Sequence, residues 1–170
     1  LSLFQESENR IWIGTDGGGI NSFNPFTEKF AHYPSTWEDK VASICPFTPG
    51  KLLISLFSQG VFIFNPATGE KHPFTIVDNE TNTRLCNRGK AVNFATEQEG
   101  QDIIGTLLPI GNYQDYTYIN DTKHIYELDN RTNRLKALYS CRKDTVINSV
   151  SRDEEGHFWI GSNYGLIHYH

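Results

Sequence analysis

The sequence lacks several features that would assign a function at once. Its 170 residues include no methionine, and 15 Lys and Arg are outnumbered by 20 Asp and Glu, which gives a net charge of -5. Nucleic-acid binders usually carry a basic surface, so we expect no nucleic-acid partner. No apolar run approaches the roughly 18 residues of a membrane-spanning helix, so we expect no direct membrane insertion by this segment.

Cysteines are few as well. They are Cys45, Cys86 and Cys141, an odd number that cannot pair completely within the chain. No C-x-x-C pair or Cys/His cluster suggests a metal centre. We expect small free thiols in or near the core, with one disulfide as the alternative. The chain also contains neither G-x-S-x-G nor H-E-x-x-H, and no catalytic residue and no cofactor is predicted.

What the sequence does contain is an internal repeat. Ile11–Pro25 reads IWIGTDGGGINSFNP, and 41 residues further on Leu52–Pro66 reads LLISLFSQGVFIFNP. Near the end, Phe158–Tyr169 reads FWIGSNYGLIHY and restates the first of these stretches. A period near 40 with aromatic and glycine marks is typical of β-propellers, which repeat a four-stranded antiparallel blade.

The repeat therefore predicts an all-β fold, a β-propeller of about four blades. Their approximate boundaries are 1–40, 41–85, 86–142 and 143–170, and the last blade lacks its fourth strand. Because closed propellers leave only short, protected edges, we expect a fragment of a larger propeller, with a compact four-blade ring as the alternative. The chain begins at Leu1 with no visible signal sequence, which also favours a piece of a longer protein.

The third repeat is the least regular. Its four strands are predicted at Ala91–Ala95, Gln101–Thr106, His124–Asp129 and Arg134–Tyr139. The tyrosine-rich stretch Leu107–Lys123 then becomes an insertion between the second and third strands. We expect this insertion to form a protruding loop or an extra hairpin.

Three short segments resemble ligand sites and are better explained otherwise. Asp16-Gly17-Gly18-Gly19 follows a strand but leads into another strand, so it predicts a hairpin turn rather than a phosphate loop. Asp153-Glu154-Glu155-Gly156 lacks the spacing of a calcium loop and predicts a solvated turn. His168 and His170 lie on one face of the last strand and could begin a zinc site. No third ligand is evident from the sequence, so no metal site is predicted.

The repeats resemble the two-component regulator propeller repeat. Its W-I-G-T/S strand, and the Gly-led strand ending in an aromatic residue and Asn or Asp, are matched by Arg10–Asn24, Asp153–Tyr169 and, more weakly, Gly50–Asn65. The third repeat departs from the pattern, with Ile103-Ile104-Gly105-Thr106 in place of W-I-G-T. The resemblance implies a periplasmic sensor segment of a Bacteroides-type hybrid two-component system. It further implies an oligosaccharide ligand, a homodimeric parent, and a histidine kinase and further blades and domains outside this chain.

We expect ligands on the propeller face that carries the loops between second and third strands and the connections between blades. Sugars favour flat aromatic side chains beside hydrogen-bonding groups. Trp37 is the strongest candidate because it lies outside the repeat pattern, whereas Trp12 and Trp159 occupy repeat positions and are expected in the core. Ordinary loop surface is the alternative for the whole set. The predicted ligand-binding residues are Asp16, Trp37, Phe57, Arg84, Arg88, Tyr113, Tyr116, Asn163 and Tyr164.

The sequence thus predicts a sensing propeller that binds without turnover. Two other functions stay open at this point. One is a structural or protein-interaction scaffold with no small-molecule site. The other is a glycan hydrolase or lyase, since propellers host such enzymes too.

Overall fold

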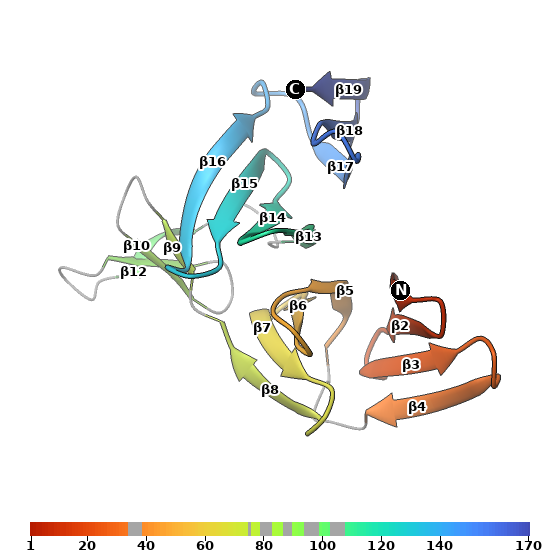
Figure 1. The fold of residues 1–170 in the computed structure, drawn as a ribbon. Helices are drawn as coiled ribbons and strands as arrows, with labels where there is room; N and C mark the ends of the chain where they lie inside the picture. The colour runs from red at the N-terminus through yellow and green to blue at the C-terminus, as the bar shows by residue number, and fades with distance from the viewer. Residues whose placement is uncertain (34–38, 75, 79–82, 87–89, 94–98, 103–107) are drawn as a thin grey trace. The chain divides into compact units, whose positions relative to one another are not determined.

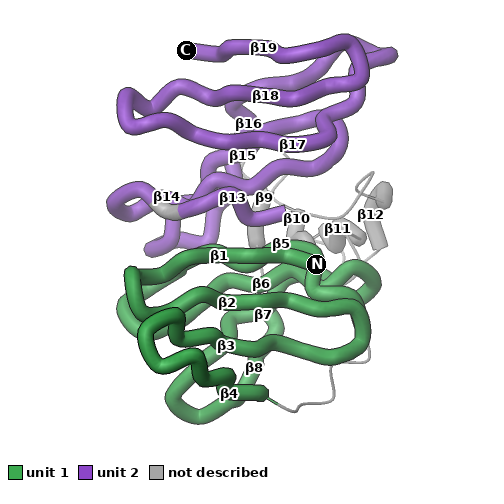
Figure 2. Tube along the Cα trace, turned by 90° about the vertical axis from the view of Figure 1, so that its right-hand side faces the viewer, with its two compact units in different colours: residues 1–74 green, residues 75–170 purple. Residues whose placement is uncertain are grey.

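The computed structural model describes the chain outside residues 34–38, 75, 79–82, 87–89, 94–98 and 103–107. All regular elements in the described part are β-strands, and they form sheets in which every pair but one is antiparallel, as in propeller blades (Figure 1). This confirms the predicted all-β propeller fold. The chain divides into two compact units, residues 1–74 and 75–170 (Figure 2). Among the described residues, no helix has the length and apolar character that a membrane crossing requires.

The first unit contains two four-stranded sheets. In each sheet the strands follow one another in chain order, and every neighbouring pair is antiparallel. The first sheet comprises β1 (Ser2–Ser7), β2 (Arg10–Gly14), β3 (Ile20–Asn24) and β4 (Lys29–Tyr33). The second comprises β5 (Val41–Pro46), β6 (Leu52–Leu56), β7 (Gly60–Asn65) and β8 (Glu70–Pro73).

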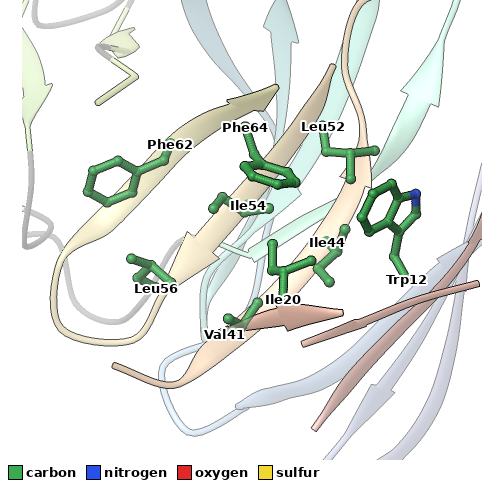
Figure 3. Close-up of a cluster of buried hydrophobic side chains, with 9 residues drawn as sticks. All are labelled: Trp12, Ile20, Val41, Ile44, Leu52, Ile54, Leu56, Phe62 and Phe64. Carbon is green, nitrogen blue, oxygen red and sulfur yellow. The ribbon is translucent and has the colours of Figure 1, made fainter. Parts of the chain in front are cut away.

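The core of the first unit lies between these two sheets. Trp12 on β2 is fully buried, and its ring lies 6.1 Å from that of Phe64 on β7 in an edge-to-face arrangement. Tyr33 completes an aromatic group, 5.5 Å from Trp12 and 5.3 Å from Phe64 between ring centroids. The prediction that Trp12 belongs to the core is confirmed. Figure 3 shows the cluster of Trp12, Ile20, Val41, Ile44, Leu52, Ile54, Leu56, Phe62 and Phe64.

The glycine of the W-I-G pattern has a packing reason. A side chain at Gly14 would bring its Cβ within 2.5 Å of Val41 Cγ1, at the start of the second sheet. The backbone there is tied closely, because Val41 N–H donates to the Thr15 carbonyl at 2.9 Å and Ser2 Oγ donates to the Val41 carbonyl at 3.1 Å. In the first repeat, the glycine of the pattern therefore marks the place where one blade meets the next.

The Asn or Asp that ends β3, β7 and β15, the third strands of the first three repeats, forms the predicted turn. Asn24 Oδ1 accepts hydrogen bonds from the N–H groups of Phe26 and Thr27, at 3.0 and 3.1 Å. Asn65 and Asp129 accept equivalent bonds from the residue two positions on, at 3.0 and 2.8 Å. These side chains replace a missing backbone acceptor, which is why this residue type recurs at the position.

The second unit contains an eight-stranded and a three-stranded sheet. The eight-stranded sheet has the order β12-β11-β10-β9-β16-β15-β14-β13, and β16 pairs with β9 in parallel. Its strands are β9 (Ile76–Asp78), β10 (Thr83–Cys86), β11 (Lys90–Asn93), β12 (Glu99–Asp102), β13 (Leu108–Tyr113), β14 (Tyr116–Asn120), β15 (His124–Asp129) and β16 (Arg134–Ser140). The three-stranded sheet is β17 (Ile147–Arg152), β18 (Phe158–Ser162) and β19 (Gly165–Tyr169).

The strand assignment of the third repeat is corrected by this order. The predicted third and fourth strands are confirmed as β15 and β16. The stretch Leu107–Lys123, expected as a protruding loop or an extra hairpin, does contain a hairpin, formed by β13 and β14. It is not an insertion outside the sheet, because β14 pairs with β15. The strands predicted at Ala91–Ala95 and Gln101–Thr106 overlap β11 and β12, which lie at the other end of the sheet. The error arose because Ile104-Gly105-Thr106 matches the I-G-T of the W-I-G-T pattern, whereas the sequence of β14 does not contain this pattern.

The two sheets of the second unit share a smaller core. Tyr118 and Ile125 come from the larger sheet, and Ile147, Phe158 and Ile160 from the smaller one. The rings of Tyr118 and Phe158 meet edge to face at 5.2 Å.

Trp159 does not belong to this core. It occupies the repeat position of Trp12 but is 38% exposed, so the prediction that it is a core residue is wrong. In the first unit the second sheet covers Trp12, whereas Trp159 stacks on His168 of its own sheet.

Candidate functional site

Two of the predicted ligand-binding residues lie close together in the first unit. Asp16 is exposed and forms an isolated β-bridge with Lys40. The N–H of Phe57, an exposed side chain in the turn between β6 and β7, donates to the carbonyl of the same Lys40 at 2.9 Å. Trp37 and Arg88 lie outside the described residues. Arg84 belongs to β10, and its side chain lies outside the description.

The four predicted residues of the second unit whose side chains are described fall into two groups. Tyr113 and Tyr116 face each other across the turn between β13 and β14, and Tyr113 lies against Arg152 at the end of β17. Asn163 lies in the turn between β18 and β19, beside Val146 at the beginning of β17. The groups therefore occupy opposite ends of β17, because the turn that carries Tyr113 and Tyr116 joins the first two strands of a blade. The single face expected for all four is not observed.

Asn163 has a structural task. Its Oδ1 accepts from the Val146 N–H at 2.7 Å, and its Nδ2 donates to the Asp144 carbonyl at 3.0 Å. Its own N–H donates to the Val146 carbonyl at 3.2 Å. These bonds fix the segment that leads into β17 and leave little of the amide for a ligand.

A cleft of about 420 Å³, here called the Arg152 cleft, lies between β13, β14 and β17. Arg152 is the last residue of β17, and the turn of Asp153 and Glu154 follows it directly. The cleft contains a guanidinium group, a hydroxyl and two carboxylates beside apolar and aromatic surface. Its lining residues are Ile110, Gly111, Tyr118, Val150, Ser151, Arg152, Asp153 and Glu154.

Three aromatic rings hold the guanidinium group of Arg152. Its Cζ atom lies 4.4 Å from the ring centroid of Tyr113, 4.8 Å from that of Tyr118 and 5.9 Å from that of Phe158. Its Nε is buried and finds no hydrogen-bond acceptor within the described part of the chain. Below the group, a side chain at Gly156 would come within 2.7 Å of an Arg152 Nη atom. Arg152 is thus positioned by stacking and by the close approach of Gly156.

The groups around Arg152 differ in charge state. Burial raises the pKa of Tyr118, whose hydroxyl donates to Glu127 Oε2 at 3.3 Å, so this phenol stays neutral. The hydrogen bond from Trp159 Nε1 lowers the pKa of Asp153, and this carboxylate also accepts from the His157 N–H at 2.9 Å. Asp153 is therefore ionised, and both of its oxygens already accept hydrogen bonds from nearby residues. Glu154 is an exposed carboxylate at the cleft rim.

A second cleft, of about 530 Å³, is here called the Tyr164 cleft. It contains Tyr164, which is 73% exposed and was predicted as a ligand contact. The remaining lining residues are Tyr139, Arg142, Asp144, Thr145 and Ile167. It is larger than the Arg152 cleft. Among the described residues, however, no aromatic rings surround Arg142 as three rings surround Arg152.

Sequence reasoning did not identify Arg152 or Tyr118. Arg152 stands at the end of a first strand and directly before a turn, a position without any repeat mark. Tyr118 was assigned to an insertion, together with Tyr113 and Tyr116. One signal was available, since three tyrosines within six residues are unusual for a loop and suit a strand with one aromatic face.

Comparisons with known proteins give the fold its context. No family model matches the sequence, and no curated protein matches it significantly. Two solved structures with similar folds are extracellular domains of hybrid two-component systems from B. thetaiotaomicron. One is 18% identical, with a TM-score of 0.53 over 96% of this chain and 25% of that one. The other is 16% identical, with a TM-score of 0.54 over 99% of this chain and 29% of that one.

A computationally designed protein, Ika4, is also similar, at 11% identity and a TM-score of 0.55 over 99% of this chain and 89% of its own. The chain spans only 25% and 29% of the length of the two extracellular domains. At these identities the similarity is one of fold, and the chain shares a β-propeller fold with extracellular domains of two-component systems.

Proposed function

We propose that this chain is an extracytoplasmic sensing segment of a hybrid two-component system and that it binds an oligosaccharide. The fold shared with extracellular domains of such systems supports the sensor assignment. The W-I-G-T repeats, which resemble the two-component regulator propeller repeat, support it independently. The histidine kinase that receives the signal, and the dimer partner, belong to this proposal and lie outside the chain.

The observation that carries the binding proposal is the caged guanidinium group of Arg152. Stacking on Tyr113 and Tyr118 fixes it in place. Among the described residues no ion pair neutralises it, so its N–H groups stay available as donors. Glu154 adds a carboxylate acceptor at the rim of the same cleft. Adjacent hydroxyl groups of a sugar both donate and accept, so they fit a site that offers a fixed donor beside an acceptor.

The tyrosine rings suit the apolar faces of a sugar. Tyr113 is 47% exposed although its ring contacts Arg152, so part of its side chain is accessible to a ligand beside the cleft. A pyranose ring could lie on this surface while its hydroxyl groups reach Arg152 and Ser151.

Signal transfer would use the stiffness of the sheets. A bound sugar that contacts both the β13–β14 hairpin and β17 would hold the two sheets of the second unit in one relative arrangement. If that arrangement packs differently in the two states of a dimeric receptor, ligand binding shifts the population toward one of them.

Isothermal titration against a panel of neutral oligosaccharides tests the proposal. Arg152→Ala and Arg152→Lys should both weaken binding at least about tenfold, because lysine keeps the charge but loses the planar donor fork. Arg142→Ala, an arginine variant in the Tyr164 cleft, is the matched control and should bind like wild type. Loss of binding in Arg142→Ala alone would move the site to the other cleft. Absence of saturable binding across the panel would favour a scaffold without a small-molecule site.

A further inference from the structure

Three histidines meet at the outer edge of the three-stranded sheet. His168 lies on β19 and His170 directly follows this strand, while His157 directly precedes β18, the strand that pairs with β19. Because Phe158 pairs with Tyr169 and Trp159 with His168, His157 stands opposite His170 and on the same face. The third ligand that the sequence did not reveal is therefore supplied by the neighbouring strand.

We propose that His157, His168 and His170 form a binding site for a divalent transition-metal ion of the zinc class. One ring nitrogen from each residue lies within 4.8 Å of the others. A tetrahedral zinc ion bound at about 2.0–2.1 Å needs nitrogen atoms about 3.3–3.4 Å apart. His170 is exposed and lies beyond the end of β19, so rotation of its ring can close the difference without moving the sheet.

Neighbouring carboxylates support the site. His157 Nδ1 lies 3.7 Å from Asp153 Oδ2 and 3.6 Å from Glu155 Oε2. A carboxylate beside one nitrogen of an imidazole orients the ring and strengthens the other nitrogen as a metal ligand. The exposed Glu155 can supply a fourth ligand itself, since Asp153, Glu155 and His157 also place ligand atoms within 4.8 Å of one another.

His168 is held in a fixed orientation. Its ring stacks on that of Trp159 at 4.1 Å and 17° between planes, and Trp159 Nε1 donates to Asp153 Oδ2 at 2.8 Å. A chain of contacts therefore runs from Asp153 through Trp159 to His168, while Asp153 also faces His157. The same carboxylate thus positions two of the three ligands. Their side chains therefore lose less conformational entropy when the metal binds.

The ligand set selects the class of metal. Imidazole nitrogens suit zinc, copper and nickel, whereas calcium and magnesium require oxygen ligands. A bound ion would tie the edge strand β19 to the start of β18, and this role is independent of any sugar in the Arg152 cleft.

Titration of the untagged, metal-free chain with zinc sulfate tests the proposal. We expect one ion per chain, with an affinity that falls at least about tenfold in His168→Ala and in His170→Ala. Both residues are exposed, so these variants should fold as wild type does, which thermal unfolding without metal checks. His72→Ala removes an exposed histidine from the edge strand β8 and should leave zinc affinity unchanged.

Two results would overturn the site. One is equal zinc affinity in wild type and in the His168→Ala/His170→Ala double variant. The other is the absence of saturable binding in wild type. Cobalt substitution gives an independent readout, because three nitrogen ligands and a fourth donor in tetrahedral geometry produce an intense visible spectrum, and this should vanish in the double variant.

Discussion

Trp12 and Trp159 occupy the same repeat position and should contribute very differently to stability. Both indole N–H groups donate to a carboxylate six residues earlier, Glu6 at 3.0 Å and Asp153 at 2.8 Å. Trp12, however, is fully buried among Tyr33 and Phe64, whereas Trp159 is 38% exposed. The hydrogen bonds are matched, so replacing each tryptophan by alanine compares burial alone.

The magnitudes follow from the buried area. A fully buried tryptophan removes about 150–250 Å² from water, and at about 25 cal/mol per Å² this amounts to about 4–6 kcal/mol. Since alanine retains part of the contact, Trp12→Ala should lower the free energy of unfolding by about 3–5 kcal/mol. Trp159→Ala leaves no closed cavity, because water reaches the site, and should cost only about 1–2 kcal/mol.

Urea unfolding followed by far-UV circular dichroism measures both effects. Each variant is compared with wild type at the same temperature, and a change in the midpoint without a change in slope reports stability. Equal losses in the two variants, or a larger loss for Trp159→Ala, would refute the inference that the second sheet buries Trp12 while Trp159 stays at a surface.

Two further predictions concern titratable groups. Burial raises the pKa of the Cys45 thiol, so in native protein at pH 8 a thiol reagent followed by peptide mass spectrometry should modify Cys141 much faster than Cys45; comparable rates would contradict the buried position of Cys45. Burial also acts to raise the pKa of Asp39, but hydrogen bonds from the N–H and Oγ of Ser58, at 2.7 and 2.8 Å, together with the Lys40 N–H, outweigh it and lower the pKa. A carboxyl with a lowered pKa in the folded state stabilises the fold above the pKa of the unfolded chain, about 3.9, and loses this effect as the pH falls through the folded value. The difference in urea midpoint between wild type and Asp39→Asn should thus be constant above about pH 5 and shrink below about pH 4; a difference that shrinks only above pH 5 would show that another group is responsible.

Most of the fold could be predicted from the sequence because the blades repeat a recognisable pattern. The matching of Ile11–Pro25 with Leu52–Pro66 predicted both sheets of the first unit, because each marked residue has a local task. The side chain of Asn24 accepts a hydrogen bond that forms a turn, and the lack of a side chain at Gly14 allows Val41 of the next blade to approach. These roles depend only on the backbone of one blade and its neighbour. The same residue types therefore recur at a fixed spacing in the sequence.

The third repeat and the candidate sites depend on contacts that spacing does not encode. The stretch at Leu107–Lys123 forms strands without a Trp or Gly mark, so the search for the mark selected the wrong segment. The proposed role of Arg152 depends on its contacts with Tyr113 and Tyr118, which lie on another sheet. The proposed role of His157 depends on the register that places it opposite the end of β19. Sheet order and register, rather than residue type, bring these groups together.

Amide chemical-shift mapping of the isotope-labelled chain tests whether an oligosaccharide binds in the Arg152 cleft. On titration with the tightest-binding oligosaccharide of the panel, we expect the largest shifts at Gly111, Ser151 and Glu154, which line the cleft. Shifts concentrated at Thr145 and Tyr164, or no shifts at saturating concentration, would contradict it.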